Sequence, residues 1–177
     1  MVNVIKKESF IYLFITVAAV VIFIDQLTKY LIFLNMPEWE AGFVSIHLIK
    51  NTGAGFGILQ DHALALALVS LIVALSILVH YKKIPQQRTP QFFFALFFSG
   101  VVGNFIDRIA RGYVIDFLDL SFWPAFNVAD ASITVAMLGI IIYFWKGDKI
   151  AHNQNKNHLT QVCAAKPTST AASRESN

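Results

Sequence analysis

The chain has 177 residues, of which 56% are hydrophobic and 14% are charged. A soluble domain has roughly 45–50% apolar and about 25% charged residues, so this composition argues against a soluble protein and predicts a membrane protein. The formal charge of +3 is spread along the chain without a basic stripe, and we therefore expect no nucleic-acid partner. The single cysteine, Cys163, excludes an intramolecular disulfide and makes a zinc cluster implausible.

Four apolar blocks alternate with polar segments along the chain. A hydrocarbon layer of about 30 Å is crossed by about 20 helical residues, and the blocks cover residues 10–34, 63–81, 91–109 and 127–145. No A-x-A cleavage site follows the first block and three more blocks do, so we interpret it as a retained helix and not as a signal peptide. The pattern predicts an all-α membrane domain of four transmembrane helices over residues 1–150.

The basic residues predict the orientation of these helices. If the N-terminus is cytoplasmic, ten of the fourteen lysines and arginines face the cytoplasm, and the positive-inside rule favours this arrangement. We therefore expect both termini in the cytoplasm. Acidic residues contribute little to orientation, yet most of them fall in the outward-facing half, which indicates a function there: Asp25, Glu38, Glu40, Asp61, Asp107, Asp116, Asp119 and Asp130.

The two outer segments contain short extended pieces. Residues 44–48 alternate apolar and polar side chains, and residues 113–120 form a second extended stretch before Pro124. Between them, residues 51–57 contain three glycines, including Gly53, which allow the backbone to approach a partner closely. We expect a small β element, a cradle on the outer membrane surface. Residues 151–177 are too polar to form a core, and we expect them to be a disordered cytoplasmic tail.

Charged side chains inside the spans are the first candidates for a function, because a carboxylate in a spanning helix is costly unless it is paired or faces water. Asp25 and Lys29 are four residues apart and share a helix face. Asp107 has Arg108 beside it and Arg111 four residues later. For both aspartates we expect a structural ion pair.

Asp116 and Asp130 differ because no basic residue lies within four positions of either in the sequence. Two carboxylates that share a site cannot both ionise easily, so one retains a proton near neutral pH. Such a pair can activate water with the ionised member and protonate a leaving group with the other. Spacing alone leaves Asp119 as a rival to Asp116.

Other functional classes leave fewer traces in the sequence. H-E-x-x-H and G-x-S-x-G are both absent, which argues against a zinc protease and a nucleophilic serine. Ser99, Gly100 and Gly103 are more typical of close helix packing. A transporter with Asp25, Lys29 and Asp130 as a proton relay requires ionisable residues at several depths, whereas these cluster at one end. A non-enzymatic scaffold leaves the two aspartates unexplained.

Five short motifs follow one another in register with the four blocks. They read DQLTK at 25–29, NTGAGF at 51–56, GNFIDR at 103–108, VIDF at 114–117 and PAFNVAD at 124–130. Over residues 10–146 the chain resembles the lipoprotein signal peptidases, or signal peptidase II, of bacteria.

The resemblance implies an aspartic endopeptidase of the bacterial inner membrane, with its site on the periplasmic side. Because one chain contains both aspartates, we expect a monomer. The resemblance also implies removal of signal peptides from prolipoproteins by cleavage before a cysteine that carries a diacylglyceryl group, without a metal or organic cofactor. Asp116 and Asp130 match the catalytic pair. The matching supporting positions are Asn51, Gly53, Asn104, Arg108, Asn127, Asp25 and Lys29.

Overall fold

The computed structural model describes the backbone of residues 2–54 and 58–164 and the side chains of residues 10–54 and 58–147. Within this part, the α-helices are α1 (Val2–Asn35), α2 (Ala63–Val79), α3 (Arg88–Arg111) and α4 (Val128–Ala164). A short 3-10 helix, η2 (Tyr81–Lys83), follows α2. Residues up to Ile140 form one compact unit that holds the sheet and the candidate site, and the remainder of α4 belongs to a second unit.

Three helical segments are long and apolar enough to cross a membrane: Phe10–Asn35, Arg88–Arg111 and Val128–Gly147. α2 is also apolar but has only 17 residues, at the lower end of what spans a bilayer. Many large apolar side chains on these helices are exposed, among them Phe23 and Leu64, as expected for surfaces that contact lipid. The expected membrane protein is confirmed, whereas four spans and two cytoplasmic termini stay predictions.

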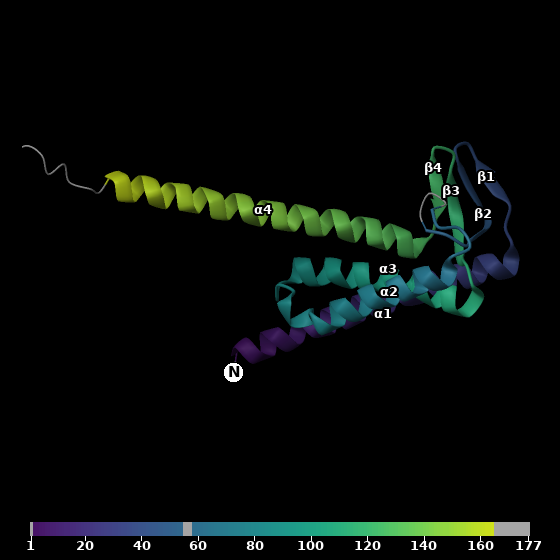
Figure 1. Ribbon diagram of the computed structural model, residues 1–177, viewed down its shortest axis with the longest axis horizontal. Coiled ribbons are helices and arrows are strands. Elements are labelled where there is room, and N and C mark those ends of the chain that lie inside the picture. The colour runs from purple at the N-terminus through teal and green to yellow at the C-terminus, as the bar shows by residue number, and fades with distance from the viewer. Residues whose placement is uncertain (1, 55–57, 165–177) are drawn as a thin grey trace, which may run out of the picture. The chain divides into compact units, whose positions relative to one another are not determined.

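The four strands form one antiparallel sheet in the order β1-β2-β3-β4. β2 (Val44–Asn51) and β3 (Val114–Leu120) correspond to the two predicted extended pieces, and their pairing joins segments far apart in the chain. β1 (Trp39–Ala41) and β4 (Trp123–Phe126) were not expected, because one has three residues and the other contains Pro124. Both are edge strands, where a proline is tolerated. In Figure 1 the strands run across the axes of α1, α2 and α3.

α4 differs from the sequence-based expectation at its C-terminal end. No regular structure was expected from residue 151 onward, but the helix continues to Ala164. The segment has no glycine or proline between residues 148 and 164, and Ala, Gln, Lys and Leu favour helix even where they cannot form a core. Residues 165–177 lie outside the described residues, so the domain boundary at 150 stays a prediction.

The middle of α3 packs closely against the other helices. The small residues there predicted this packing, and all three are buried: Ser99, Gly100 and Gly103. A Cβ on Gly100 would lie 2.7 Å from Cγ1 of Ile133 and even closer to the backbone oxygen of Ala129. α3 and the first turns of α4 therefore meet through a position that only glycine fits.

We expect Gly100→Ala to lower the free energy of unfolding by about 1–3 kcal/mol, because the methyl group must displace backbone or a buried side chain. Thermal unfolding in detergent measures the effect. Gly147→Ala is the matched control, since a Cβ there meets nothing within 4 Å. Equal stability of the two variants would contradict the close approach of α3 and α4.

Candidate active site

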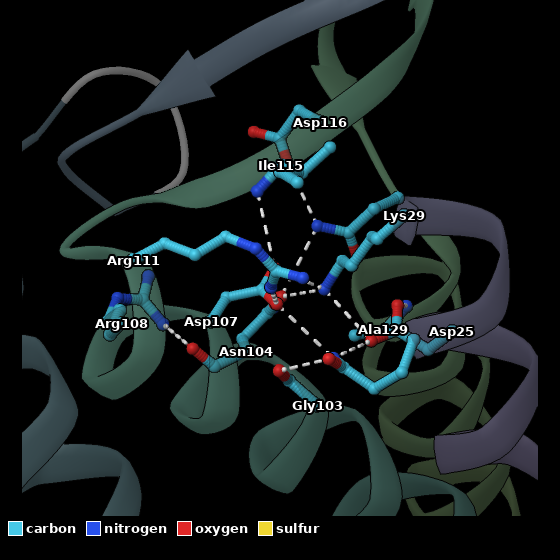
Figure 2. Close-up of polar contacts among 12 residues, drawn as sticks. Asp25, Lys29, Gly103, Asn104, Asp107, Arg108, Arg111, Ile115, Asp116 and Ala129 are labelled. Atoms are coloured by element: carbon cyan, nitrogen blue, oxygen red, sulfur yellow. Dashed lines mark hydrogen bonds and ion pairs between the residues drawn. The ribbon is translucent and has the colours of Figure 1, made fainter. Parts of the chain in front are cut away.

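A buried ion cluster joins α1 to α3 below the sheet, and Figure 2 shows its side chains. Nζ of Lys29 lies 2.9 Å from Asp25, one helical turn earlier, and 3.0 Å from Asp107 on α3. All three side chains are fully buried. The ion pair expected between Asp25 and Lys29 is confirmed, and Lys29 also pairs with Asp107, which the sequence did not indicate.

Asp107 links the cluster to the start of β3. Arg111, four residues later on α3, forms the expected ion pair with one carboxylate oxygen, and the other accepts a hydrogen bond from the backbone N–H of Ile115 at 3.2 Å. Two carboxylates and two cations therefore balance, which is the condition for burying such charges. Gln26, which the sequence analysis did not single out, contacts both carboxylates at 3.1 and 3.3 Å. A polar residue inside an apolar span could have indicated this role of Gln26 from the sequence.

The first turn of α4 is held by a reciprocal cap. The backbone N–H of Asp130 donates to Oδ1 of Asn127 at 3.0 Å, and the N–H of Asn127 donates to Oδ2 of Asp130 at 3.3 Å. This is the arrangement of a capping box, which satisfies two backbone donors at a helix start. Oδ1 of Asp25 accepts the N–H of Ala129 at 2.8 Å, so the ion cluster also fixes the start of α4. The carboxylate of Asp130 is thereby held in place.

Asn127 connects the two candidate aspartates. Its Nδ2 donates to Oδ1 of Asp116 at 2.7 Å while its backbone N–H donates to Asp130. Asp130 also accepts a hydrogen bond from Nδ2 of Asn104 at 2.8 Å. Oδ1 of Asn104 in turn accepts bonds from Lys29 at 3.0 Å and from Asn127 at 3.3 Å, which fixes the orientation of its amide.

Asp116 lies at the base of β3 with only 2% of its surface exposed. Asn51, at the end of β2, donates to its Oδ2 at 2.8 Å. The pKa of Asp116 is raised from 3.8 to about 6, mainly because burial disfavours the charged form and further because of the negative charge of Asp130. Hydrogen bonds from Asn51 and Asn127 offset part of this rise. The carboxyl group thus retains a proton at a pH where an exposed aspartate is ionised.

Both aspartates line a cavity of about 760 Å³ between the sheet and the starts and ends of the helices. Arg108 lines it as well and donates through Nη2 to the backbone oxygen of Gly53 at 3.1 Å and through Nη1 to that of Asn104 at 3.4 Å. Among the described side chains the guanidinium makes no ion pair, and its buried Nε has no hydrogen-bond partner. Apolar side chains also line the cavity, including Trp123, Phe126 and Ile133.

The structure brings most of the predicted site residues to one cavity. The cavity is lined by Asn51, Asn104, Arg108, Asp116 and Asp130, and Asn127 lies directly behind them. Asp25 and Lys29 do not line the cavity and act on it only through Asn104 and α4.

The rival aspartate Asp119 lies elsewhere. It is partly exposed on β3 and lies 3.8 Å from His47 of β2. Since it does not line the cavity, Asp116 is the better partner for Asp130.

Titration of Asp116 makes the stability of the protein depend on pH. Its pKa is about 6 in the folded protein and 3.8 in an exposed chain, so the folded state binds more protons between these values. The stabilising contribution is complete below about pH 4 and is lost as the pH rises through about 6, a change of roughly 3 kcal/mol. Asp116→Asn removes this titration. In thermal unfolding at pH 4 and pH 7, we expect the variant to gain stability relative to the parent chain at the higher pH, and a difference independent of pH would contradict the assignment.

Comparisons with known proteins agree with the residue pattern. The model of the Signal peptidase (SPase) II family matches residues 17–146. A lipoprotein signal peptidase of Moorella thermoacetica is 39% identical over 139 residues, which cover 75% of this chain and 91% of the relative. One of Staphylococcus haemolyticus is 33% identical over 151 residues, 80% of this chain and 96% of the relative.

Solved structures give the same result at the level of the fold. One bacterial membrane enzyme superposes with a TM-score of 0.70 at 32% identity, covering 75% of this chain and 87% of the other. A second has a TM-score of 0.66 at 33% identity, covering 74% and 91%. The chain belongs to the signal peptidase II family of lipoprotein-processing membrane proteases.

Proposed function

We propose that the chain is an aspartic endopeptidase that removes signal peptides from diacylglyceryl-modified prolipoproteins by cleavage before the lipidated cysteine. The observation that carries the proposal is the position of Asp116 and Asp130 on either side of Asn127 in one cavity. Family membership supports the substrate class. The buried ionisable side chains of the described residues all gather at this end of the helices, which is unlike a proton pathway through the membrane.

The two aspartates divide the work of hydrolysis. The ionised carboxylate takes a proton from a water molecule as its oxygen attacks the scissile carbonyl carbon, and the protonated carboxyl donates to the carbonyl oxygen. As the resulting diol collapses, the C–N bond breaks, the first aspartate gives its proton to the leaving nitrogen, and the second aspartate takes a proton from a diol hydroxyl group, which restores the starting protonation of the pair. Burial and the negative charge of Asp130 raise the pKa of Asp116, which favours one proton shared by the pair when both carboxyl groups face the cavity.

The remaining cavity residues hold the pair and the substrate. Asn51, Asn104 and Asn127 donate to the carboxylates and fix their orientation. Arg108 places a positive charge beside the cavity, where it stabilises negative charge that develops on the scissile carbonyl oxygen. The hydrogen bond from Arg108 to the backbone oxygen of Gly53 holds the loop after β2 at the side of the cavity where Arg108 lies.

The location of the site fits a lipid-anchored substrate. Asp116 lies just after the end of α3 and Asp130 in the first turn of α4, so the peptide meets the aspartates where the helices leave the membrane. The acyl chains of the modified cysteine then remain in the bilayer while water reaches the scissile bond. We place this end on the periplasmic side of the bacterial inner membrane and both termini in the cytoplasm. One chain supplies both aspartates, and we propose a monomer with residues 151–177 as a dispensable tail.

A cleavage assay with matched substrates tests the proposal. The purified protein is incubated in detergent with a lipid-modified prolipoprotein and, separately, with the same precursor in which the cysteine is replaced by serine. We expect release of the signal peptide from the lipidated precursor only. Equal cleavage of both precursors would contradict a lipid-dependent peptidase, and no cleavage of either would contradict the proposed activity.

Labelling of single cysteines tests the orientation in a Cys163→Ser background. Ser121→Cys, in the exposed β3–β4 turn, should react with a membrane-impermeant thiol reagent added outside intact spheroplasts. Gln86→Cys, between η2 and α3, should react only after the membrane is opened, because the positive-inside rule places that segment in the cytoplasm. Labelling of Gln86→Cys from outside would invert the orientation.

A further inference from the structure

The carboxylate of Asp107 holds the strand that carries Asp116. Its Oδ2 accepts the backbone N–H of Ile115 at 3.2 Å, and Ile115 directly precedes Asp116 in β3. In the described part of the chain, β4 pairs with β3 at Leu118 and Leu120 but not at Ile115, so the carboxylate takes the place of a neighbouring strand there. Asp107 and Ile115 are both fully buried, where an unpaired backbone N–H is costly.

The carboxylate of Asp25 makes the corresponding contact at the start of α4. Its Oδ1 accepts the backbone N–H of Ala129 at 2.8 Å, and Ala129 directly precedes Asp130. The N–H groups in the first turn of a helix have no acceptor within the helix, so this one depends on an acceptor from outside. Ala129 is fully buried as well. Each candidate catalytic aspartate therefore follows a residue whose backbone is held by a buried carboxylate (Figure 2).

One lysine joins the two carboxylates. Nζ of Lys29 lies 2.9 Å from Oδ2 of Asp25 and 3.0 Å from Oδ2 of Asp107. We name Asp25, Lys29 and Asp107 the positioning frame. The path from the N–H of Ile115 to that of Ala129 runs through this frame and contains only buried, charge-assisted contacts. Contacts of this kind are short and directional, so they fix the separation of the two segments that they join.

The positioning frame acts on backbones, whereas the amides of the site act on side chains. Asn51 and Asn127 donate to the carboxylate of Asp116, and both hydrogen bonds orient that group without anchoring its strand. The residues of the frame are absent from the described residues that line the cavity. A substrate in the cavity therefore does not touch the frame.

We propose that Asp107 and Asp25, bridged by Lys29, are positioning residues that set the separation of Asp116 and Asp130. This inference rests on the proposed function, because the separation matters only if the two aspartates act on one water molecule and one scissile bond. Groups that act together in this way work over a narrow range of distances, and a displacement of about 1 Å costs about 100-fold in rate. Supporting contacts outside the cavity maintain such distances.

Replacing a single backbone N–H tests the positioning frame without changing any side chain. In the full chain, Ile115 is replaced by its α-hydroxy acid analogue, so that an ester oxygen stands where the N–H donates to Asp107. The matched control carries the same change at Ser121, just after the other end of β3. The N–H of Ser121 donates to the backbone oxygen of Phe43 at 3.1 Å, so both chains lose one backbone hydrogen bond of similar length.

We expect the Ile115 ester to lower kcat for a lipidated precursor by about 10-fold to 100-fold, with KM within about two-fold of the parent chain. The corresponding ester at Ala129, which removes the N–H held by Asp25, should have the same effect. The Ser121 ester should keep the parental kcat. Equal kcat in the Ile115 and Ser121 esters, or a loss confined to KM, would overturn the proposal.

A second readout does not depend on catalysis. Burial raises the pKa of Asp116 to about 6, so this residue stabilises the folded chain more at pH 4 than at pH 7. Release of the strand exposes Asp116 and reduces this difference, whereas a general loss of stability lowers the midpoint of thermal unfolding equally at both pH values. We expect a smaller difference between pH 4 and pH 7 in the Ile115 ester than in the Ser121 ester.

The two readouts separate this proposal from the proposed function. An equal pH difference in the Ile115 and Ser121 esters would overturn the positioning frame even if the parent chain cleaves its precursor. A parent chain that cleaves nothing would contradict the proposed function, and a reduced pH difference in the Ile115 ester would then still support the frame.

Two side-chain variants cover the case in which the ester chains do not fold. Asp107→Asn and Asp107→Leu are each combined with Arg111→Met, which removes the cation paired with Asp107 and keeps the net charge of the cluster unchanged. The two replacements are similar in size, but only asparagine retains an oxygen that accepts the N–H of Ile115. We expect Asp107→Asn/Arg111→Met to have at least about 10-fold higher kcat per folded molecule than Asp107→Leu/Arg111→Met. Equal kcat in these two chains would overturn the proposal.

Discussion

Asp116→Asn and Asp130→Asn should each lower kcat/KM for a lipidated precursor by about 100-fold to 10,000-fold, the contribution typical of a general acid or base. Asparagine nearly preserves the shape of aspartate, so the cap on α4 and the contact with Asn127 need only small adjustments. It cannot accept a proton from water or donate one to a carbonyl oxygen. Initial rates of signal-peptide release, with thermal unfolding to verify the fold, measure the loss.

Asp119→Asn is the matched control for both variants. Asp119 lies on the same strand as Asp116 but is partly exposed beside His47 and does not line the cavity. It should retain most of the parental rate. Near-normal turnover by Asp116→Asn or Asp130→Asn, or an equal loss in Asp119→Asn, would contradict the assignment of the pair.

Lys29→Met should cause the largest loss of stability of any single substitution in the ion cluster, about 3–5 kcal/mol, because it leaves buried carboxylates without their shared cation. Nζ of Lys29 lies within 3.0 Å of Asp25, Asp107 and the amide of Asn104. Its removal also releases the amide of Asn104 that donates to Asp130, so cleavage should fall with stability. Thermal and denaturant unfolding in detergent measure the first effect.

Two variants distinguish loss of this ion cluster from loss of any lysine. Lys50→Met removes an exposed cation that lies over the ring of Tyr113, and it should cost less than about 1 kcal/mol. Adding Asp25→Asn to Lys29→Met should recover part of the stability, because Asp107 still has Arg111 as a partner. No recovery in the double variant would show that the loss comes from packing and not from unpaired charge.

The helices and the two inner strands could be predicted because their signals are local. Apolar runs define α1, α3 and α4, and alternation at residues 44–48 indicated β2. β1 and β4 could not be predicted, since three or four residues with a proline carry no periodic pattern and depend on pairing with distant strands. The helix after residue 151 was not predicted, because a polar composition excludes a hydrophobic core but does not exclude a helix.

Part of the candidate site could be predicted from the sequence, again because some of its contacts are local. Asp25 and Lys29 lie one helical turn apart, so their pairing follows from spacing alone. The contact of Lys29 with Asp107 and the double contact of Asn127 with Asp116 and Asp130 join residues from different elements. Spacing could not choose between Asp116 and Asp119 either, because the choice depends on which residues of β3 face the cavity.

The most direct test of catalysis by Asp116 and Asp130 is the mass of both products formed from a lipidated precursor in water enriched in oxygen-18. Aspartate-activated water should cut the bond before the modified cysteine, leave that cysteine as the new N-terminus with its diacylglyceryl group, and place one heavy oxygen in the new carboxylate of the signal peptide. The Asp116→Asn and Asp130→Asn variants should leave the precursor intact under the same conditions. A cut at another bond, a product without the heavy oxygen, or the same products from either variant would contradict the proposed role of Asp116 and Asp130.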